Sequence, residues 1–261
     1  LKPDPALQAR IDALIQTIAA AQEPDGYIYT WRTIAERNQK NGTPPGTEGT
    51  GARMASSQRW VNEDQHSHEL YNAGHLYEAA VAWYYATGSR KLLDVAIKNA
   101  DLVDRTFGPG KLKKAPGHQE IEIGLAKLYQ ATNERRYLNL ARFFLDARGY
   151  GEAYMQNHQP LRDQREAVGH AVRASYMFAG AADVMAFSSD TVFMPALRAV
   201  WDDIVSSKMY VTGGVGSTGS NEGFSDPYEL PNYSAYCETC ASIAFALWNQ
   251  RMFQLTGSIK G

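Results

Sequence analysis

The sequence contains few cysteines. Only two occur among its 261 residues, Cys237 and Cys240, and one pair three positions apart cannot form a disulfide framework. A buried thiol pair and a redox Cys-x-x-Cys motif are the ordinary interpretations, and the redox one is weak because no βαβ pattern surrounds the pair. A metal site is the third interpretation, and it needs further ligands from elsewhere.

Long apolar runs and an excess of charge of one sign are also lacking. No run approaches the ~20 apolar residues that span a bilayer. The formal net charge of -2 gives no reason to expect nucleic acid or an anionic membrane surface as a partner. The first residues, Leu1–Pro5, do not resemble a secretory signal. Because no initiator methionine precedes them, localisation stays open. The sequence does not indicate an oligomeric state either.

Apolar residues at helical spacing are plentiful instead. The first helix is expected after Asp4, which can cap it, with Pro5 in its first turn. A stretch from 38 to 58 is rich in glycine, threonine, serine and proline, which predicts a loop, either a mobile lid or a surface insertion. Further helices are expected in pairs, at 68–87 and 90–107, at 118–132 and 135–148, at 170–188 and 191–209, and at 238–256 without a partner.

The joints between paired helices resemble one another, which is typical of a repeated helical hairpin. They are Ala86–Gly88, Ala131–Asn133, Ser188–Asp190 and Leu255–Gly257. Such hairpins stack as a solenoid or close as a toroid. The choice rests on polar groups that stand at a similar distance before each joint and therefore share one end of the assembly: His68–Glu69, His118–Glu120, His170 and Glu238–Cys240. A solenoid has no reason to collect such groups along one rim, so an all-α toroid with one pocket is predicted.

Three of the six histidines occupy equivalent positions in this repeat. An isolated histidine is more often structural than functional. The shared position in the repeat favours a functional role for His68, His118 and His170. Neutral imidazoles at helix N-termini can donate hydrogen bonds to ligand hydroxyl groups, and a three-histidine metal site is the alternative. The remaining three are interpreted as structural: His66, His75 and His158.

The segment 211–238 combines glycines with carboxylates. Its G-x-G-x-x-G pattern at Gly214, Gly216 and Gly219 is not followed by a helix, so a dinucleotide site is rejected. We interpret these glycines as allowing the backbone to approach a pocket closely. Almost no lysine or arginine accompanies the carboxylates, so one of them beside apolar groups can keep the raised pKa of a general acid. The alternative is a solvated acidic loop formed by Glu222, Asp226, Glu229 and Glu238.

Glu238 and Cys240 begin the last predicted helix. Two positions apart, they would not share a face in mid-helix. At a helix entry both can point at one ion. A carboxylate and a thiolate suit zinc, although two ligands do not complete a tetrahedral site.

Several ordered motifs resemble glycoside hydrolase family 127, the β-L-arabinofuranosidase family. They are SHELYNAGHLYEAAVAWYYATG from Ser67, PGHQEIEIGLAKLY from Pro116, RDQREAVGHAVR from Arg162, and MYVTGGVGST, NEGF, YELPN and YCETCAS from Met209 onward. The resemblance runs from Pro5 to Gly257. It implies an (α/α)6 barrel, of which residues 1–261 would form an incomplete part. The earliest helices, a later cysteine-pair segment and a β-sandwich domain would lie outside them.

The resemblance also implies an activity. It is the retaining release of terminal β-L-arabinofuranose from plant glycans, with an oligosaccharide or a glycoprotein glycan as substrate. By motif, Glu222 matches the general acid/base, and Glu238 and Cys240 match two ligands of a Zn²⁺ ion. His68, His118 and His170 match residues that line the sugar site, whereas Cys237 matches no ligand and is interpreted as structural.

The nucleophile that the resemblance implies is a zinc-bound cysteine thiolate from an adjacent cysteine pair. This chain has no such pair, so the nucleophile is expected outside it, and the 261 residues alone are not expected to turn over substrate. Three alternatives stay open: a hydrolase of another pectic sugar, such as the branched-acid xylose of complex pectin; a non-catalytic helical toroid that binds carbohydrate or acts as a scaffold; and an isomerase or epimerase that uses the histidines without zinc. Glu238 and Cys240 argue against the last.

Overall fold

A computed structural model of the protein describes residues 4–41, 59–63 and 67–257. The first helix, α1 (Pro5–Ala21), begins as predicted, because the Asp4 carboxylate accepts the backbone N–H groups of Ala6 and Leu7, each at 3.0 Å. The mostly polar helix α2 (Thr30–Lys40) was not predicted, and it includes residues 38–40 of the expected loop. Residues 42–58 of that loop lie outside the described part of the chain.

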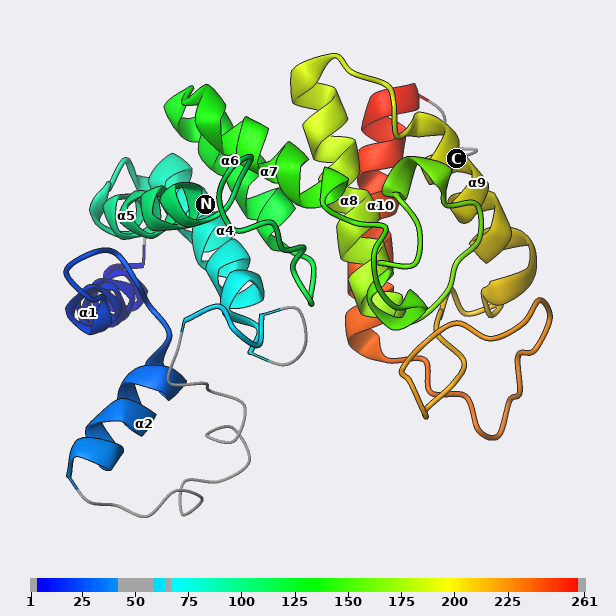
Figure 1. Ribbon diagram of the computed structural model, residues 1–261, viewed down its shortest axis with the longest axis horizontal. Coiled ribbons are helices and arrows are strands. Elements are labelled where there is room, and N and C mark those ends of the chain that lie inside the picture. The colour runs from blue at the N-terminus through cyan, green and yellow to red at the C-terminus, as the bar shows by residue number, and fades with distance from the viewer. Residues whose placement is uncertain (1–3, 42–58, 64–66, 258–261) are drawn as a thin grey trace.

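The predicted helix pairs are present. They are α4 (Glu69–Thr87) with α5 (Lys91–Thr106), α6 (Ile121–Thr132) with α7 (Arg135–Asp146), and α8 (Ala171–Ser188) with α9 (Met194–Asp203), followed by α10 (Thr239–Thr256). Helix α4 packs against α6, α6 against α8, and α8 against α10, while α5, α7 and α9 each pack against the first helix of their pair. Figure 1 shows α4, α6, α8 and α10 following one another across the molecule. The all-α toroid prediction is confirmed. No helix within the described ranges is long and apolar enough to cross a membrane.

Each predicted joint closes with the same backbone device. Gly88, Asn133, Ser189 and Gly257 follow their helices in the left-handed region, with φ of 73°, 59°, 57° and 66°. In each, the N–H bonds back to the carbonyl four residues earlier. This conformation is a common way to end a helix. The repeat in the sequence is therefore a repeat of helix caps.

Close backbone contact fixes the inner helices relative to one another. A Cβ added to Gly124 of α6 would lie 2.6 Å from the carbonyl oxygen of Gly74 in α4, so only glycine allows these helices to approach so closely. Helix α8 is buried on almost all sides, and its Phe178 ring stacks on Trp248 of α10 at 4.8 Å. This packing sets where the helix N-termini meet.

The helix starts differ from prediction in an informative way. The helices predicted from His68, His118, His170 and Glu238 begin slightly later, so these residues stand at or before the N-caps. The helix predicted at 191–209 begins only at Met194, where Pro195 occupies the first turn, and its last turn, Ile204–Lys208, is a π-helix.

Candidate active site

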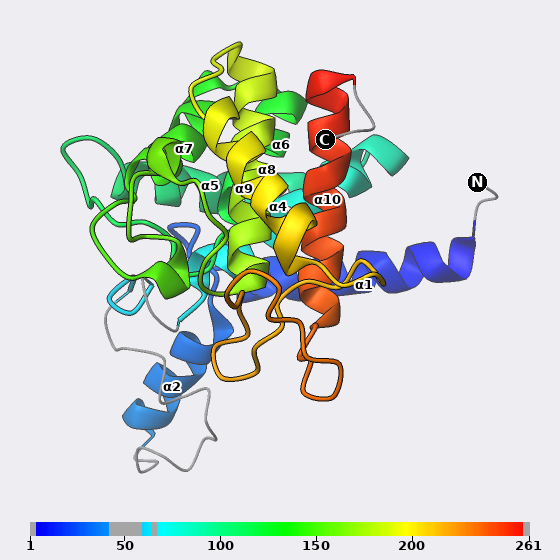
Figure 2. The same ribbon diagram turned by 90° about the vertical axis from the view of Figure 1, so that its right-hand side faces the viewer.

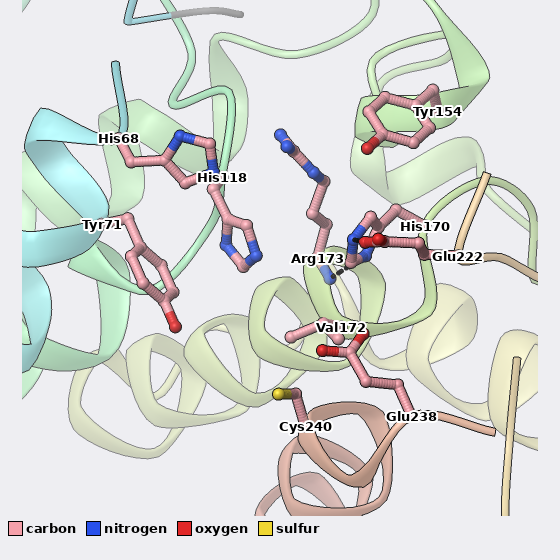
Figure 3. A pocket seen from close by; sticks show the side chains of 10 residues that line it. All are labelled: His68, Tyr71, His118, Tyr154, His170, Val172, Arg173, Glu222, Glu238 and Cys240. Carbon is pink, nitrogen blue, oxygen red and sulfur yellow. Dashed lines mark hydrogen bonds and ion pairs between the residues drawn. The ribbon is translucent and has the colours of Figure 1, made fainter. Parts of the chain in front are cut away.

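One cavity of about 370 Å³ lies at the N-terminal ends of the inner helices. All six residues predicted as site residues line it: His68, His118, His170, Glu222, Glu238 and Cys240. Figure 3 shows His68 and His118 on one side, His170 and Glu222 opposite, and Glu238 with Cys240 at the start of α10 below them. In Figures 1 and 2 the loop after α9 lies below the same ends of α8 and α10. Asp226 and Glu229 of that loop are exposed outside the cavity lining.

Four lining residues were missed by sequence reasoning: Tyr71, Tyr154, Val172 and Arg173. Helical spacing offered a signal for two of them. Tyr71 and Arg173 each follow a predicted histidine by three positions, so they share its helix face. Tyr154 lies on a short 3-10 turn, Ala153–Met155, between α7 and α8, and no spacing rule indicated it.

The three predicted histidines form a row. Ring centroids lie 5.4 Å apart from His68 to His118 and 5.7 Å apart from His118 to His170. The Nδ1 atom of His118 lies 3.0 Å from the carbonyl oxygen of Gln119, so Nδ1 carries the proton and Nε2 is left as an acceptor. Burial, and then the Arg173 charge, hold the pKa of His118 well below 6.5. A neutral imidazole of this kind suits a ligand with hydroxyl groups.

A buried ion pair holds the segment that carries His118. The Arg148 guanidinium lies 3.4 Å from the Glu122 carboxylate, and neither side chain is exposed. Arg148 also donates to the carbonyl of Pro116 at 3.2 Å, and Glu122 accepts the backbone N–H of Glu120 at 3.2 Å. Pro116 before His118 and Glu120 after it therefore both contact this buried pair.

Glu222 receives two hydrogen bonds at the side of the cavity. His170 caps α8 by accepting the Arg173 backbone N–H on Nδ1 at 3.5 Å, so its proton is on Nε2, which donates to Glu222 Oε2 at 2.7 Å. The hydroxyl of Tyr236 donates to Glu222 Oε1 at 3.1 Å. Burial, followed by the Arg173 charge, lowers the pKa of His170 below 6.5, which agrees with a neutral donor.

Three residues in or near this site have a left-handed backbone. His68, Glu222 and Cys237 have φ of 55°, 53° and 41°, a region that costs a non-glycine residue on the order of 1–3 kcal/mol. The loop also makes the close approach that its glycines predicted, because a Cβ added to Gly216 would lie 2.9 Å from Cβ of Ala171. Packing against the start of α8 holds Glu222 in this conformation.

Glu238 and Cys240 meet at the start of α10. Glu238 raises the pKa of the Cys240 thiol, chiefly through a side-chain hydrogen bond. Glu238 Oε2 is buried and has no hydrogen-bond partner among the described residues. An orphaned carboxylate oxygen beside a thiol fits two of the four positions of a zinc ion. Cys237 does not line the cavity, and its backbone N–H donates to Gly216.

Comparison with known proteins places these residues in context. A family model described as the catalytic domain of GH127 β-L-arabinofuranosidases matches residues 1–260. A curated non-reducing end β-L-arabinofuranosidase of Bifidobacterium longum subsp. longum is 39% identical over 284 residues, which cover 97% of this chain and 40% of that protein.

Two solved structures are similar over 98% of the chain. The GH127 β-arabinofuranosidase BT3674 is 49% identical with a TM-score of 0.89, and 39% of its chain is covered. Ara127N-Se, a GH127 β-L-arabinofuranosidase from Geobacillus stearothermophilus T6, is 40% identical with a TM-score of 0.86, and 41% of its chain is covered. The chain therefore spans about two-fifths of the length of these relatives.

Proposed function

The chain belongs to glycoside hydrolase family 127, and from that premise we propose that the complete protein releases terminal β-L-arabinofuranose from plant glycans by a retaining mechanism. One observation carries the proposal. A row of three imidazoles, two carboxylates and a thiol line a single cavity. The relatives that match nearly the whole chain are named for this activity.

The cavity suits a single neutral sugar. Its volume of about 370 Å³ lies near the lower end of small-molecule sites. His118 presents Nε2 as an acceptor, and the Arg173 guanidinium lies 4.9 Å over the Tyr154 ring, so its donors are held in place. Each hydroxyl group of a furanose both donates and accepts hydrogen bonds, so acceptors and donors in fixed positions suit such a ligand.

Glu222 is the acid/base in this proposal. Its proton passes to the glycosidic oxygen as that bond breaks, and the resulting carboxylate then takes a proton from the water that completes hydrolysis. His170 and Tyr236 each donate to one oxygen of the carboxylate, so they orient it through both steps.

Glu238 and Cys240 would hold two positions of a zinc ion in the complete protein. A bound zinc ion keeps a ligating thiolate deprotonated at neutral pH. The two cysteines of this chain are not adjacent, so the nucleophilic cysteine and the remaining ligands belong, in this proposal, to the part of the relatives' length that the chain does not span. Glu238 is the N-cap residue of α10, so the helix fixes the position of this proposed ligand.

The experiment is zinc analysis and glycosidase assay of the complete protein, with an aryl β-L-arabinofuranoside as substrate. We expect Cys240→Ser to lose about one zinc per chain together with activity, while Cys237→Ser, the matched control, keeps both. Full activity in Cys240→Ser, or in protein stripped of metal, would overturn the zinc-thiolate mechanism.

A carboxylated pectic sugar is the second candidate substrate, because the cavity contains a cation. Arg173 is buried beside the histidine row, and its Nε has no hydrogen-bond partner among the described residues. Arginine pairs strongly with carboxylates. Assay of the same protein with a glycoside of the branched-acid xylose decides between the two substrates. A higher kcat/KM for this acidic sugar than for the arabinofuranoside would make the acidic sugar the preferred substrate.

A further inference from the structure

A second set of metal-type donors lies between α4 and α6, outside the cavity lining. It consists of His75, Glu78 and Glu120, and we refer to it as the His75 cluster. One donor atom from each residue lies within 4.8 Å of the other two. His75 and Glu78 share a face of α4 at three-residue spacing. Glu120 stands at the N-cap position of α6, which packs against α4, but its side chain makes no capping hydrogen bond.

Two tyrosine rings contact both this cluster and the histidine row. The Tyr71 ring centroid lies 4.6 Å from that of His75 and 4.2 Å from that of His118. The corresponding distances for Tyr176 are 5.7 Å and 6.3 Å. The His75 cluster is therefore a separate group of side chains, reached along α4 from the cavity.

The Glu120 carboxylate is the unexplained member of the cluster. Its side chain is 0% exposed, and neither oxygen has a hydrogen-bond partner among the described residues. A buried carboxylate without a partner costs several kcal/mol. Lys127 forms its direct ion pair with Glu78 and acts on Glu120 only through its charge, and His75 adds a positive charge beside Glu120 only when it is protonated.

The donor spacing fits an ion. A tetrahedral zinc ion with ligands at about 2.0–2.2 Å places its donor atoms roughly 3.3–3.6 Å apart. His75 Nδ1 lies 3.4 Å from Glu120 Oε1 and 3.8 Å from Glu78 Oε2. In the cavity, by contrast, His170 and Glu222 lie at a hydrogen-bond distance of 2.7 Å. The second oxygen of Glu78 is held by Lys127, as ligating carboxylates commonly are by an outer partner.

We propose that His75, Glu78 and Glu120 bind a divalent cation, with water completing its coordination. One imidazole and two carboxylates are donors that suit zinc. The cation supplies the positive charge that the buried Glu120 carboxylate lacks, and it ties α4 to α6 directly behind the histidine row. This site is independent of the proposed glycosidase function and of the ligands Glu238 and Cys240.

A proton is the competing explanation for Glu120. Burial, followed by the neighbouring Glu78, raises the pKa of Glu120 well above 4.5. In a metal-free protein Glu120 would then be a neutral acid that shares its proton with Glu78. The two states differ in a measurable way, because a cation displaces that proton and binds less tightly at acid pH.

The test uses the complete protein carrying Cys240→Ser, which removes a cavity ligand. After the protein is stripped with a chelator, Zn²⁺ binding is measured by calorimetry and by elemental analysis. We expect about one zinc per chain, and a loss of affinity of more than about tenfold when Glu120→Gln or His75→Gln is added. Glu134→Gln, which removes an exposed carboxylate elsewhere, should leave binding unchanged.

Two outcomes would overturn the site. One is no zinc in the Cys240→Ser protein, together with an infrared band of a protonated carboxylic acid that disappears in Glu120→Gln. The other is unchanged affinity in both cluster variants. His75 has a side chain that is 40% exposed, so His75→Gln keeps the test valid if Glu120→Gln fails to fold. The difference in zinc content between the unmutated protein and Cys240→Ser measures the cavity site alone. Failure of the cavity site is therefore distinguishable from failure of the His75 cluster.

Discussion

One group in the cavity (His170, Glu222 and Glu238) and the His75 cluster each bring one imidazole together with two carboxylates, yet their geometries differ. In the cavity, His170 lies 2.7 Å from Glu222, whose side chain is 44% exposed. In the cluster, His75 lies 3.4 Å from Glu120, whose side chain is 0% exposed. The shorter contact is a hydrogen bond through which a proton can be held or moved, whereas the longer one leaves room for an ion between the donors. Identical residue types thus favour different chemistry according to spacing and burial.

The supporting backbone differs as well. Glu222 stands on a loop, in the left-handed region, and depends on contacts with the start of α8. Glu120 stands at an N-cap beside the close contact of Gly74 with α6. A loop allows a carboxylate to change partners during a reaction, while packed helices hold donors at fixed spacing.

The largest expected effect is on the cavity side of this comparison. Glu222→Gln in the complete protein should lower kcat/KM by about 10² to 10⁴, the usual worth of a positioned proton donor. An activated aryl glycoside needs less acid assistance, so its first step should lose less. Glu229→Gln, in the same loop but exposed, is the matched control. If Glu222→Gln lowers kcat/KM neither for the natural glycan nor for the aryl glycoside, Glu222 is not the acid.

Local signals in the sequence located six of the ten residues that line the cavity. The helix joints, the N-cap positions and the glycine loop are each set by residues close together in the chain, so periodicity and capping rules located His68, His118 and His170 at one end of the toroid. The contact of Tyr236 with Glu222 was not predictable, since it depends on how the loop folds back over fourteen positions.

The His75 cluster shows where such signals end. His75 was interpreted as structural because it does not share the repeat position of His68, His118 and His170. Its partner Glu120 is brought within reach only by the packing of α4 on α6 through Gly74 and Gly124. Contacts between helices depend on side-chain volumes that a single sequence does not resolve into distances.

One buried ion pair, Arg148–Glu122, contacts the segment that carries His118 and Glu120, and breaking it should destabilise the protein. Arg148→Met leaves Glu122 buried without its partner, which costs about 3–5 kcal/mol. The loss is measured as a lower free energy of unfolding in urea. Arg90→Met, which removes an exposed helix pair with Asp94, should cost no more than about 0.5 kcal/mol. Equal losses in the two variants would show that the buried pair does not support the segment around His118.

Acid should affect the cavity row through His118. Its pKa is held well below 6.5 in the folded state, so below that pH the unfolded chain binds a proton that the folded protein does not. Stability therefore falls as pH decreases from about 6.5, by up to about 1.4 kcal/mol per pH unit, until the lowered folded pKa is reached. His118→Gln should flatten this slope in urea unfolding measured between pH 7 and 5. An unchanged slope would mean that His118 is not held neutral by burial.

The smallest expected effect separates orientation from proton transfer at Glu222. Tyr236→Phe removes the hydroxyl that donates to Glu222 Oε1 at 3.1 Å but leaves the His170 contact on the other oxygen. Loss of one hydrogen bond to a carboxylate should lower kcat/KM by about two- to tenfold, and the loss should be larger for an unactivated glycoside than for an aryl glycoside, because the unactivated one depends more on proton donation. Tyr233→Phe, a fully exposed neighbour, should lower kcat/KM for neither substrate. An equal loss with both substrates would show that Tyr236 only shapes the cavity wall, and that His170 alone orients the acid.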